Sequence, residues 1–220
     1  MKSALFIWGG TDEHEPEKCV RLLADVLHLA GFSVQFADNL RVLTDRAKLR
    51  AVSVIVPCWN QGVITAEEEQ NLLGAVYNGA GIAGWHGGMG DAFRAAAGYQ
   101  FMVGGQFVAH PGNLVTYRVH ITDHRHPISR GIPDFEITSE QFYMHVDPSN
   151  HVLANTRFAP RPGYEWIADT VMPVVWTRPW GRGRVFYSSI GRRAADFDVS
   201  EVRDLTRRGI LWAAKSLTEI

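Results

Sequence analysis

Cysteine is scarce in this chain, and its scarcity excludes several kinds of site. Only Cys19 and Cys58 occur among the 220 residues. A disulfide framework is therefore not expected, and neither a Cys-x-x-Cys pair nor a His-Glu-x-x-His motif is present to hold zinc. Each cysteine lies in a segment of regularly spaced apolar residues. We expect two reduced, buried thiols, as is usual in a cytosolic protein.

The chain also lacks an excess of charge of either sign. Its 22 Lys and Arg residues face 23 Asp and Glu residues, which leaves a formal net charge of −1. No broad electrostatic field therefore attracts nucleic acid or an anionic membrane. Arginines do gather between residues 178 and 193 and could bind an anion. Arginines in strands and loops are more often solvated or paired with carboxylates, and this is our interpretation of Arg182.

Long apolar runs are absent as well, since none approaches the ~18 residues that a membrane-spanning helix requires. The run from Ala4 to Trp8 is too short for a signal sequence, and no small-residue cleavage site follows it. We therefore expect a soluble, cytoplasmic protein. With 46% hydrophobic residues, the chain can form one globular domain that spans residues 1–220.

What the first half of the chain contains is an alternation of strand and helix patterns. Strands are predicted at residues 4–8, 34–37, 52–56 and 82–85, with a loop at 57–62 and with helices that begin at Pro16, near Asp45 and after Thr65. Thr65 and Glu68 have the spacing of a capping box, and Gly31 is expected to cap the first helix. Short links between alternating strands and helices indicate βαβ units on a parallel sheet.

The second half changes to a succession of strands. They are predicted at residues 115–122, 151–156, 173–177 and 184–189, with a hairpin-like loop at 179–183 and a closing helix at about 200–217.

The most informative motif is Gly84-Trp85-His86-Gly87-Gly88, which follows an apolar strand. Its spacing is that of a nucleophile elbow, in which serine or cysteine stands between a strand and a helix. Imidazole occupies that position here. Glycines, which have no Cβ, allow such a sharp turn, and we expect the turn to present His86 into a cleft. The alternative is a structural histidine bonded to nearby backbone.

Two further polar clusters follow predicted strands. Residues 11–14 come after the first strand, and residues 59–61 come after the third. In an open parallel sheet, ligands bind beyond the carboxyl ends of the strands. These clusters and His86 are therefore expected to line one cleft.

Seven segments carry a likeness to known proteins, and they are residues 79–88, 104–111, 126–128, 140–143, 172–178, 181–187 and 208–214. In their order and spacing they resemble the ThuA-like (trehalose utilisation) family. The resemblance implies an α/β fold. This would be a flavodoxin-like three-layer sandwich with a mostly parallel sheet and added C-terminal antiparallel strands, as in class I glutamine amidotransferases.

The resemblance also implies a role in sugar catabolism, alongside oxidoreductases that make keto-sugars from disaccharides or glycosides. One departure matters, because such proteins usually carry Gly-His after the last strand and this chain has Gly191-Arg192. A guanidinium has no proton-accepting nitrogen, so position 192 cannot supply a metal ligand or a general base. Glutaminase activity is excluded too, because it needs a thiolate where His86 stands.

The candidate catalytic residues are His86, Glu140 and His14. The imidazole of His86 can act as a general base, a hydrogen-bond donor or a metal ligand. Glu140 lies among apolar residues, and burial would raise its pKa into a range useful for proton transfer. A surface charge at a strand edge is the alternative for Glu140, and the family likeness favours function. His14 follows acidic residues in a loop that faces the predicted cleft.

A sugar presents C–H faces that stack on aromatic rings and hydroxyls that seek polar partners. The candidate substrate-binding residues are Trp59, Asn60, Gly87, His110, Tyr143 and Arg192. No cofactor is certain from the sequence. A divalent metal held by His14, His86 and Glu140 as a mixed nitrogen and oxygen site is the open alternative.

Together with the substrate class that the family resemblance implies, these residues favour an enzyme that acts on a disaccharide, glycoside or keto-glycoside by acid/base chemistry, through hydrolysis, elimination or isomerisation. Glu140 and His86 would exchange protons with the sugar, while His14 and Arg192 would polarise its oxygens. A non-catalytic sugar-binding or regulatory domain and a metal-dependent hydrolase are the alternatives. The expected partner is a small-molecule sugar, with no nucleic acid and no membrane. A homodimer is compatible with this architecture.

Overall fold

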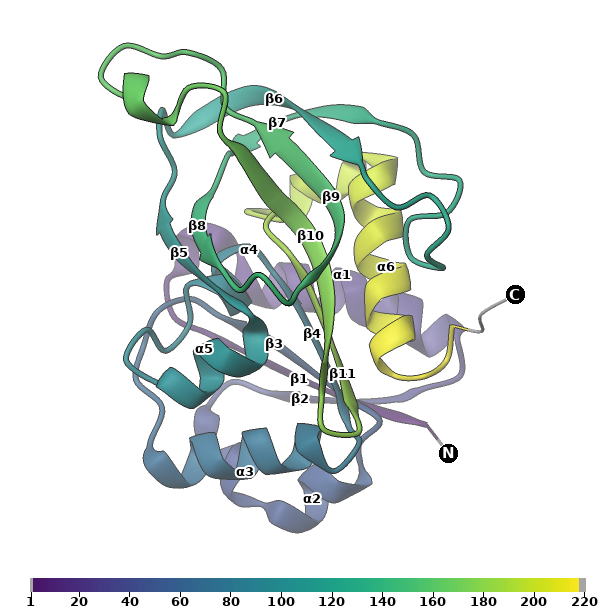
Figure 1. The fold of residues 1–220 in the computed structure, drawn as a ribbon. Helices are drawn as coiled ribbons and strands as arrows, with labels where there is room; N and C mark the ends of the chain where they lie inside the picture. Colours follow the sequence, from purple (N-terminus) through teal and green to yellow (C-terminus); the bar gives the residue numbers. More distant parts are fainter. Residues whose placement is uncertain (1, 218–220) are drawn as a thin grey trace.

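A nine-stranded β-sheet lies at the centre of the computed structural model, which describes residues 2–217 (Figure 1). The strands are β1 (Ser3–Gly9), β2 (Ser33–Ala37), β3 (Val54–Trp59), β4 (Gly81–Trp85), β5 (Gly105–Ala109), β6 (Leu114–Ile121), β7 (Phe135–Glu140), β8 (Tyr143–Val146), β9 (His151–Arg157), β10 (Val171–Trp180) and β11 (Gly183–Ser188). Their order in the large sheet is β2-β1-β3-β4-β11-β10-β9-β6-β7, and β5 pairs with β8 in a separate two-stranded sheet.

The direction of the strands changes at β11. From β2 to β11 every neighbouring pair is parallel, and from β11 to β7 every pair is antiparallel. The predicted fold, a mostly parallel sheet with antiparallel strands added by the second half of the chain, is thereby confirmed.

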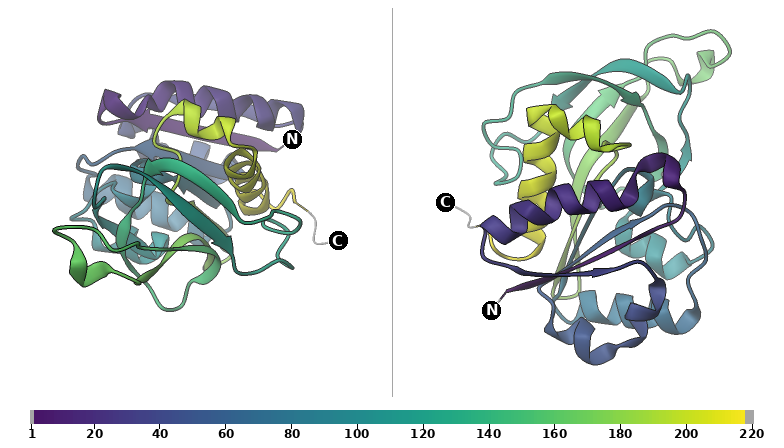
Figure 2. Two further views of the ribbon diagram at one scale, coloured as in Figure 1. Left: turned by 90° about the horizontal axis from the view of Figure 1, so that it is seen from above. Right: turned by 180° about the vertical axis from the view of Figure 1, so that it is seen from behind.

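Helices cover both faces of the sheet, as expected for a three-layer sandwich. They are α1 (Pro16–Leu29), α2 (Arg46–Ala51), α3 (Ala66–Tyr77), α4 (His86–Gly90), α5 (Ala97–Val103) and α6 (Ser200–Ala213). Figure 2 shows α1 and α6 together on one face, opposite α2, α3 and α5. Within residues 2–217, none of the helices combines the length and the apolar character needed to cross a bilayer.

The sequence of β1 explains why both faces of the sheet are covered. Successive side chains of a strand point to opposite faces. Ala4 and Phe6 belong to the core that contains residues of α1 and α6, whereas Leu5 and Ile7 belong to the core that contains residues of α2 and α3. A continuous apolar run of this kind is typical of a strand buried on both sides.

Strand β3 lies later in the chain than predicted, because it begins at Val54 and not at Val52. It continues through Pro57 to Trp59, in register with β1, whereas the sequence predicted a loop from residue 57. β3 pairs with β4 only at Val54 and Ile55. Beyond Ile55 one side of the strand needs no hydrogen-bond donors, so a proline without an N–H is tolerated there.

Helix α6 is shorter than predicted, because it ends at Ala213 and not at Leu217. Lys215 follows with a left-handed backbone (φ 54°), and the Ser216 N–H donates to the Leu211 carbonyl at 2.8 Å. This is the hydrogen bond of a Schellman cap. Glycine usually marks such a cap, and none stands at position 215, so the sequence carried no signal for it.

The predicted capping box begins α3 and supports a first expectation. The Thr65 Oγ1 accepts from the Glu68 N–H at 3.3 Å, and the Glu68 carboxylate accepts from the Thr65 N–H at 2.9 Å. Thr65→Ala removes the acceptor, and we expect it to lower the free energy of unfolding by about 1 kcal/mol. Urea denaturation measures this loss. A variant as stable as the parent would show that the cap contributes nothing.

Candidate functional site

His86 begins the turn from β4 into α4 and carries the strain of that turn. Its φ is +47°, in the left-handed region that residues with a Cβ adopt rarely. The sequence assigned the sharp turn to the flanking glycines, and in the structure the histidine itself adopts the unusual backbone. The glycines supply space instead. A Cβ on Gly88 would lie 2.9 Å from Cα of Cys58, and a Cβ on Gly84 would lie 2.6 Å from Cβ of Met89.

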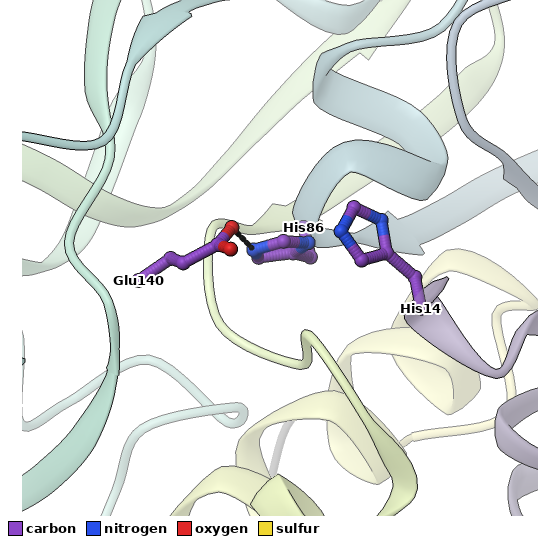
Figure 3. A group of neighbouring side chains, drawn as sticks. All are labelled: His14, His86 and Glu140. Atoms are coloured by element: carbon purple, nitrogen blue, oxygen red, sulfur yellow. Dashed lines mark ion pairs between the residues drawn. The ribbon is translucent and has the colours of Figure 1, made fainter. Parts of the chain in front are cut away.

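The three predicted catalytic residues come together from distant parts of the chain. Figure 3 shows His86 between Glu140, at the end of β7, and His14, in the one-turn helix η1 (Asp12–His14). The Nε2 of His86 lies 3.1 Å from the Oε2 of Glu140. Neither ring nitrogen of His86 makes a well-aligned hydrogen bond within residues 2–217. The ring centroids of His14 and His86 are 5.1 Å apart in an edge-to-face arrangement.

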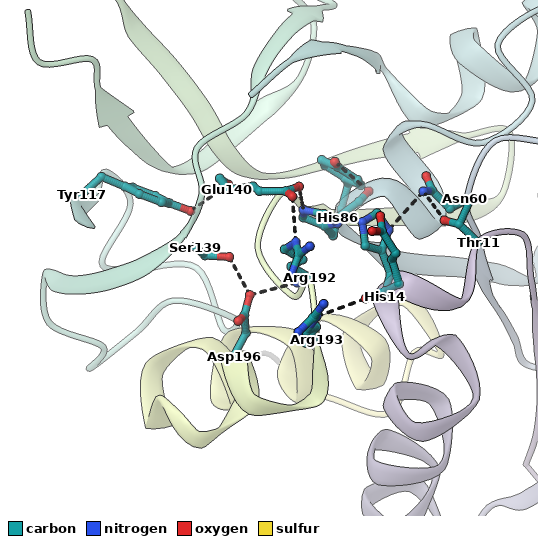
Figure 4. Close-up of polar contacts among 12 residues, drawn as sticks. Thr11, His14, Asn60, His86, Tyr117, Ser139, Glu140, Arg192, Arg193 and Asp196 are labelled. Carbon is teal, nitrogen blue, oxygen red and sulfur yellow. Dashed lines mark hydrogen bonds and ion pairs between the residues drawn. The ribbon is translucent and has the colours of Figure 1, made fainter. Parts of the chain in front are cut away.

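Arg192 holds the other oxygen of Glu140. Its Nε donates to Oε1 of Glu140 at 2.7 Å. Its backbone N–H donates to Oδ2 of Asp196 at 2.9 Å, and the Ser139 hydroxyl donates to the same oxygen at 2.7 Å. Figure 4 shows this network beside the histidines. Asp196 and Ser139 were not predicted as site residues, because nothing in their local sequence links them to Glu140.

The charge state of Glu140 differs from the prediction. Burial alone would raise its pKa, and this is the largest single effect. The hydrogen bond and charge interaction with His86, the hydrogen bond from Arg192 and the charge interaction with His110 together outweigh burial and lower the pKa of Glu140 to about 2. The prediction of a raised pKa was wrong because it considered only the apolar neighbours in the sequence. Glu140 is a carboxylate at neutral pH.

Both histidines are neutral at neutral pH. Burial lowers the pKa of His86 below the ordinary 6.5 and outweighs the attraction of Glu140. Burial also lowers the pKa of His14 to about 4, and the proximity of His86 adds to the effect. The site therefore holds two uncharged imidazoles beside one carboxylate, and the fixed positive charge of Arg192 balances that carboxylate.

Asn60, a predicted substrate-binding residue, holds His14 in place. All of its polar groups are satisfied when its Oδ1 accepts from the His14 Nδ1–H and the Thr11 hydroxyl, each at 3.0 Å. Its Nδ2 then donates to Asp91 and to the carbonyl of Gly87, each at 3.2 Å. This orientation places the proton of His14 on Nδ1 and leaves Nε2 as an acceptor.

Access to His86 also differs from the prediction. The sequence predicted an open cleft, and the structure buries this residue to 1% exposure. The ring centroid of Phe142 lies 4.2 Å from that of His86. The cavity beside the imidazole, which His14 and Asn60 also line, measures about 10 Å³. This is room for about one water molecule, so the site is closed.

The other predicted substrate-binding residues have different surroundings. A Cβ on Gly87 would lie 2.5 Å from the side-chain amide of Asn60, so glycine gives that amide its room. His110 is near enough for its charge to act on Glu140. Tyr143 packs its ring 6.0 Å from that of Phe158. Trp59 is packed closely against Gly9 and Gly62. Contact of any of these residues with a sugar stays a prediction.

The cluster also has the composition of a metal site. His14, His86 and Glu140 each offer one ligand atom, and the three atoms lie within 4.8 Å of one another. Neutral imidazoles and a carboxylate suit zinc and other divalent ions. The orphaned ring nitrogens of His86 fit this use. The guanidinium of Arg192 opposes it, because a second cation would share the one carboxylate.

The two lowered histidine pKa values predict how stability depends on pH. As the pH falls from about 6.5 to about 4, the two histidines bind protons in the unfolded chain but stay unprotonated in the folded site. The stability that the neutral rings contribute is present above the unfolded value and is lost over that window. We therefore expect the urea midpoint to fall across it, and His14→Asn to reduce the fall. An unchanged pH dependence in this variant would contradict the assignment.

The match with a known family extends over almost the whole chain. The model of the ThuA family, described as trehalose utilisation, matches residues 3–213. A ThuA-like protein from Parabacteroides merdae has a TM-score of 0.78 and 17% identity, with 100% of this chain and 92% of that one covered. A ThuA-like protein from Bacteroides uniformis has a TM-score of 0.76 and 16% identity, with 96% and 91% covered. No curated protein matches the chain.

At such low identities, the two solved structures show a common fold and nothing about activity. The family match rests on the sequence itself, and it includes the elbow with His86, the end of β7 with Glu140 and the segment that carries Arg192. The chain belongs to the ThuA family, which points to a role in the use of carbohydrates.

Proposed function

We propose that this protein is a carbohydrate-processing enzyme whose reaction centre is the pair formed by His86 and Glu140. The observation that carries the proposal is the 3.1 Å distance between His86 Nε2 and Glu140 Oε2 at the elbow of a ThuA-family fold. A strained backbone that holds a buried titratable group in one position is typical of reaction centres.

The charges of the site assign different roles to the two residues. An ionised Glu140 cannot donate a proton at neutral pH, so its role is to orient the imidazole and stabilise the positive charge that the ring gains. His86 is neutral and acts as the general base. Arg192 keeps Glu140 ionised through its hydrogen bond to Oε1. His14, whose Nε2 is an acceptor, is a second base or a hydrogen-bond partner for a sugar hydroxyl.

A buried imidazole base suits two kinds of step on a sugar. It can remove a proton from water that attacks an anomeric carbon, or from a carbon next to a keto group. The first step leads to hydrolysis and the second to elimination or isomerisation. The acceptable substrates are therefore a disaccharide, a glycoside or a keto-glycoside.

Substrate entry requires the site to open. A cavity of about 10 Å³ does not admit a sugar. Residues 11–15, which contain the His14 side of the cavity, are the segment that we propose to move. It is held by the contact of His14 with Asn60 at 3.0 Å and by a hydrogen bond from Arg193 to the Glu13 carbonyl at 3.1 Å. Loops of this kind open and close over many reaction centres.

The experiment is product analysis with a panel of disaccharides and their 3-keto forms. The purified protein is incubated with each sugar, and Glu140→Gln serves as the matched variant of nearly unchanged size. We expect one class of sugar to be converted by the parent and about 10²-fold more slowly by Glu140→Gln. Binding of a sugar without conversion would favour a non-catalytic sugar-binding domain and would contradict the proposal.

A metal-dependent hydrolase is the second candidate, and the ligand atoms of His14, His86 and Glu140 favour it. In that case His14, His86 and Glu140 would hold the metal, which would supply a Lewis acid for the activation of water. The same panel is run after chelation and again with added Zn²⁺ or Mn²⁺. Activity that survives chelation supports proton transfer by His86, and activity that is lost and returns with metal supports the second candidate.

A further inference from the structure

A second hollow lies at the opposite end of the parallel strands. Its volume is about 970 Å³, and we call it the basic groove, after Arg46, Arg50, Arg182 and Lys215, which line it. Other lining residues, Val52 and Ala80, precede β3 and β4, and Arg182 precedes β11. Asn60 and His86 follow β3 and β4. A strand of this length rises roughly 15–20 Å, so the groove is well separated from His86.

The groove has positive charge without acidic partners. None of its lining residues is Asp or Glu. Among the ion pairs within residues 2–217, none includes Arg46, Arg50, Arg182 or Lys215. The whole chain has a formal net charge of −1, so this concentration of cations is local. A concave surface of one sign focuses the field and attracts anions.

Neutral groups hold three of these cations in place. The Nε of Arg46 donates to Oδ1 of Asn71 at 2.8 Å, and the buried Asn71 donates in turn to the Leu43 carbonyl at 3.0 Å. The Nζ of Lys215 donates to the carbonyls of Gly79 and Arg182 at 3.2 and 3.0 Å. Arg182 itself donates to Asn78 at 3.4 Å. These partners are uncharged, so they do not neutralise the positive charge that an anionic ligand would meet.

Gly74 borders the groove without filling it. It lies inside α3 and lines the groove, and a Cβ placed on it would meet nothing within 4 Å. Glycine in the middle of a helix destabilises that helix relative to alanine. No neighbouring atom requires the missing side chain. The space above Gly74 therefore belongs to the groove.

We propose that the basic groove binds a phosphorylated small molecule with at least two negative charges. Arg46 on α2 and Arg182 in the turn between β10 and β11 offer planar donor groups, which match phosphate oxygens well. A nucleic acid or a membrane is a poorer fit, because the cations line a hollow and the chain as a whole has a formal net charge of −1. Arg182 is exposed, as the sequence predicted, and the proposal adds an anionic ligand to it.

The test is isothermal titration calorimetry of the full chain with pyrophosphate, with orthophosphate and with fructose 1,6-bisphosphate. We expect pyrophosphate to bind more tightly than orthophosphate. Added salt should lower the affinity for pyrophosphate. Tighter binding of fructose 1,6-bisphosphate than of pyrophosphate identifies a sugar phosphate as the ligand type, and the reverse order identifies a bare diphosphate group.

Three variants test the location of the site. Arg46→Gln and Arg182→Gln each remove one charge, and we expect each to weaken pyrophosphate binding by about tenfold. Gly74→Leu fills the space above α3 without changing any charge, and we expect it to lower the affinity for pyrophosphate by about tenfold or more. Leucine favours a helix more than glycine does, so the helix should be no less stable. Arg125→Gln, an exposed arginine outside the groove, is the matched control and keeps the parental affinity.

Two results would overturn this proposal. One is the absence of pyrophosphate binding up to ~5 mM in the parent. The other is that Gly74→Leu and both arginine variants bind pyrophosphate as tightly as the parent does, because the anion would then bind elsewhere. Circular dichroism of each variant establishes that it is folded. The result does not depend on the proposed reaction at His86, because none of the substituted residues belongs to that site.

Discussion

Replacement of His86 by glutamine is expected to lower kcat/KM for the accepted sugar by about 10³-fold. Glutamine is of similar size and can donate a hydrogen bond to Glu140, but it cannot accept a proton at neutral pH. The ring of His86 is buried against Phe142, so a polar side chain of matching length disturbs this packing less than alanine would. The rate is measured with the sugar that the parent converts.

His120→Gln is the matched control for this variant. His120 also faces a carboxylate, with its Nδ1 2.9 Å from Oδ2 of Asp134, but it lies on β6 with a side chain that is 44% exposed. We expect this variant to keep the parental kcat/KM. If His86→Gln is as active as His120→Gln, the imidazole of His86 is not the base and the proposed reaction centre is wrong.

Replacement of Arg192 by methionine is expected to destabilise the fold by about 3–5 kcal/mol. The side chains of Arg192 and Glu140 are 15% and 9% exposed, and Nε and Oε1 are 2.7 Å apart. Methionine fills much of the volume but leaves a buried carboxylate without its cation. The pKa of Glu140 rises, because the hydrogen bond from Arg192 no longer opposes the effect of burial. Chemical denaturation measures the loss.

A double variant separates the charge effect from lost packing. If the uncompensated carboxylate causes the damage, then Glu140→Gln in the Arg192→Met background restores about half or more of the lost stability. Purely additive effects of the two substitutions would mean that Arg192 and Glu140 contribute independently. In that case the guanidinium does not set the charge of Glu140, and its assigned role fails.

Local sequence pattern was sufficient for the parallel half of the fold. The apolar run of β1 and the capping box at Thr65 each specify structure within a few residues, and the structure confirms both. The elbow was predicted for the same reason, since the spacing of glycines around His86 is a local feature. The convergence of His14, Asn60 and His86 followed from the rule that parallel strands end at one edge of the sheet.

What the sequence could not predict depends on contacts between distant residues. The ionised state of Glu140 is set by Arg192, which is 52 positions away in the chain, and by His86. The closed state of the site depends on Phe142, which local pattern marks only as an apolar residue. Helix α6 ends just before Lys215, whose backbone is left-handed, and no glycine in the sequence marks this position. In each case the tertiary packing decides the outcome.

The most direct test of the account is the state of the His86 ring, measured by nitrogen-15 NMR over a pH titration. The account predicts a neutral ring at pH 7 with its proton on Nε2, toward Glu140, and protonation only below the ordinary value of 6.5. In Glu140→Gln the ring should lose its preference for this tautomer. A ring that is already protonated at pH 7, or that carries its proton on Nδ1, would contradict the claim that a carboxylate holds a neutral imidazole ready to act as a base.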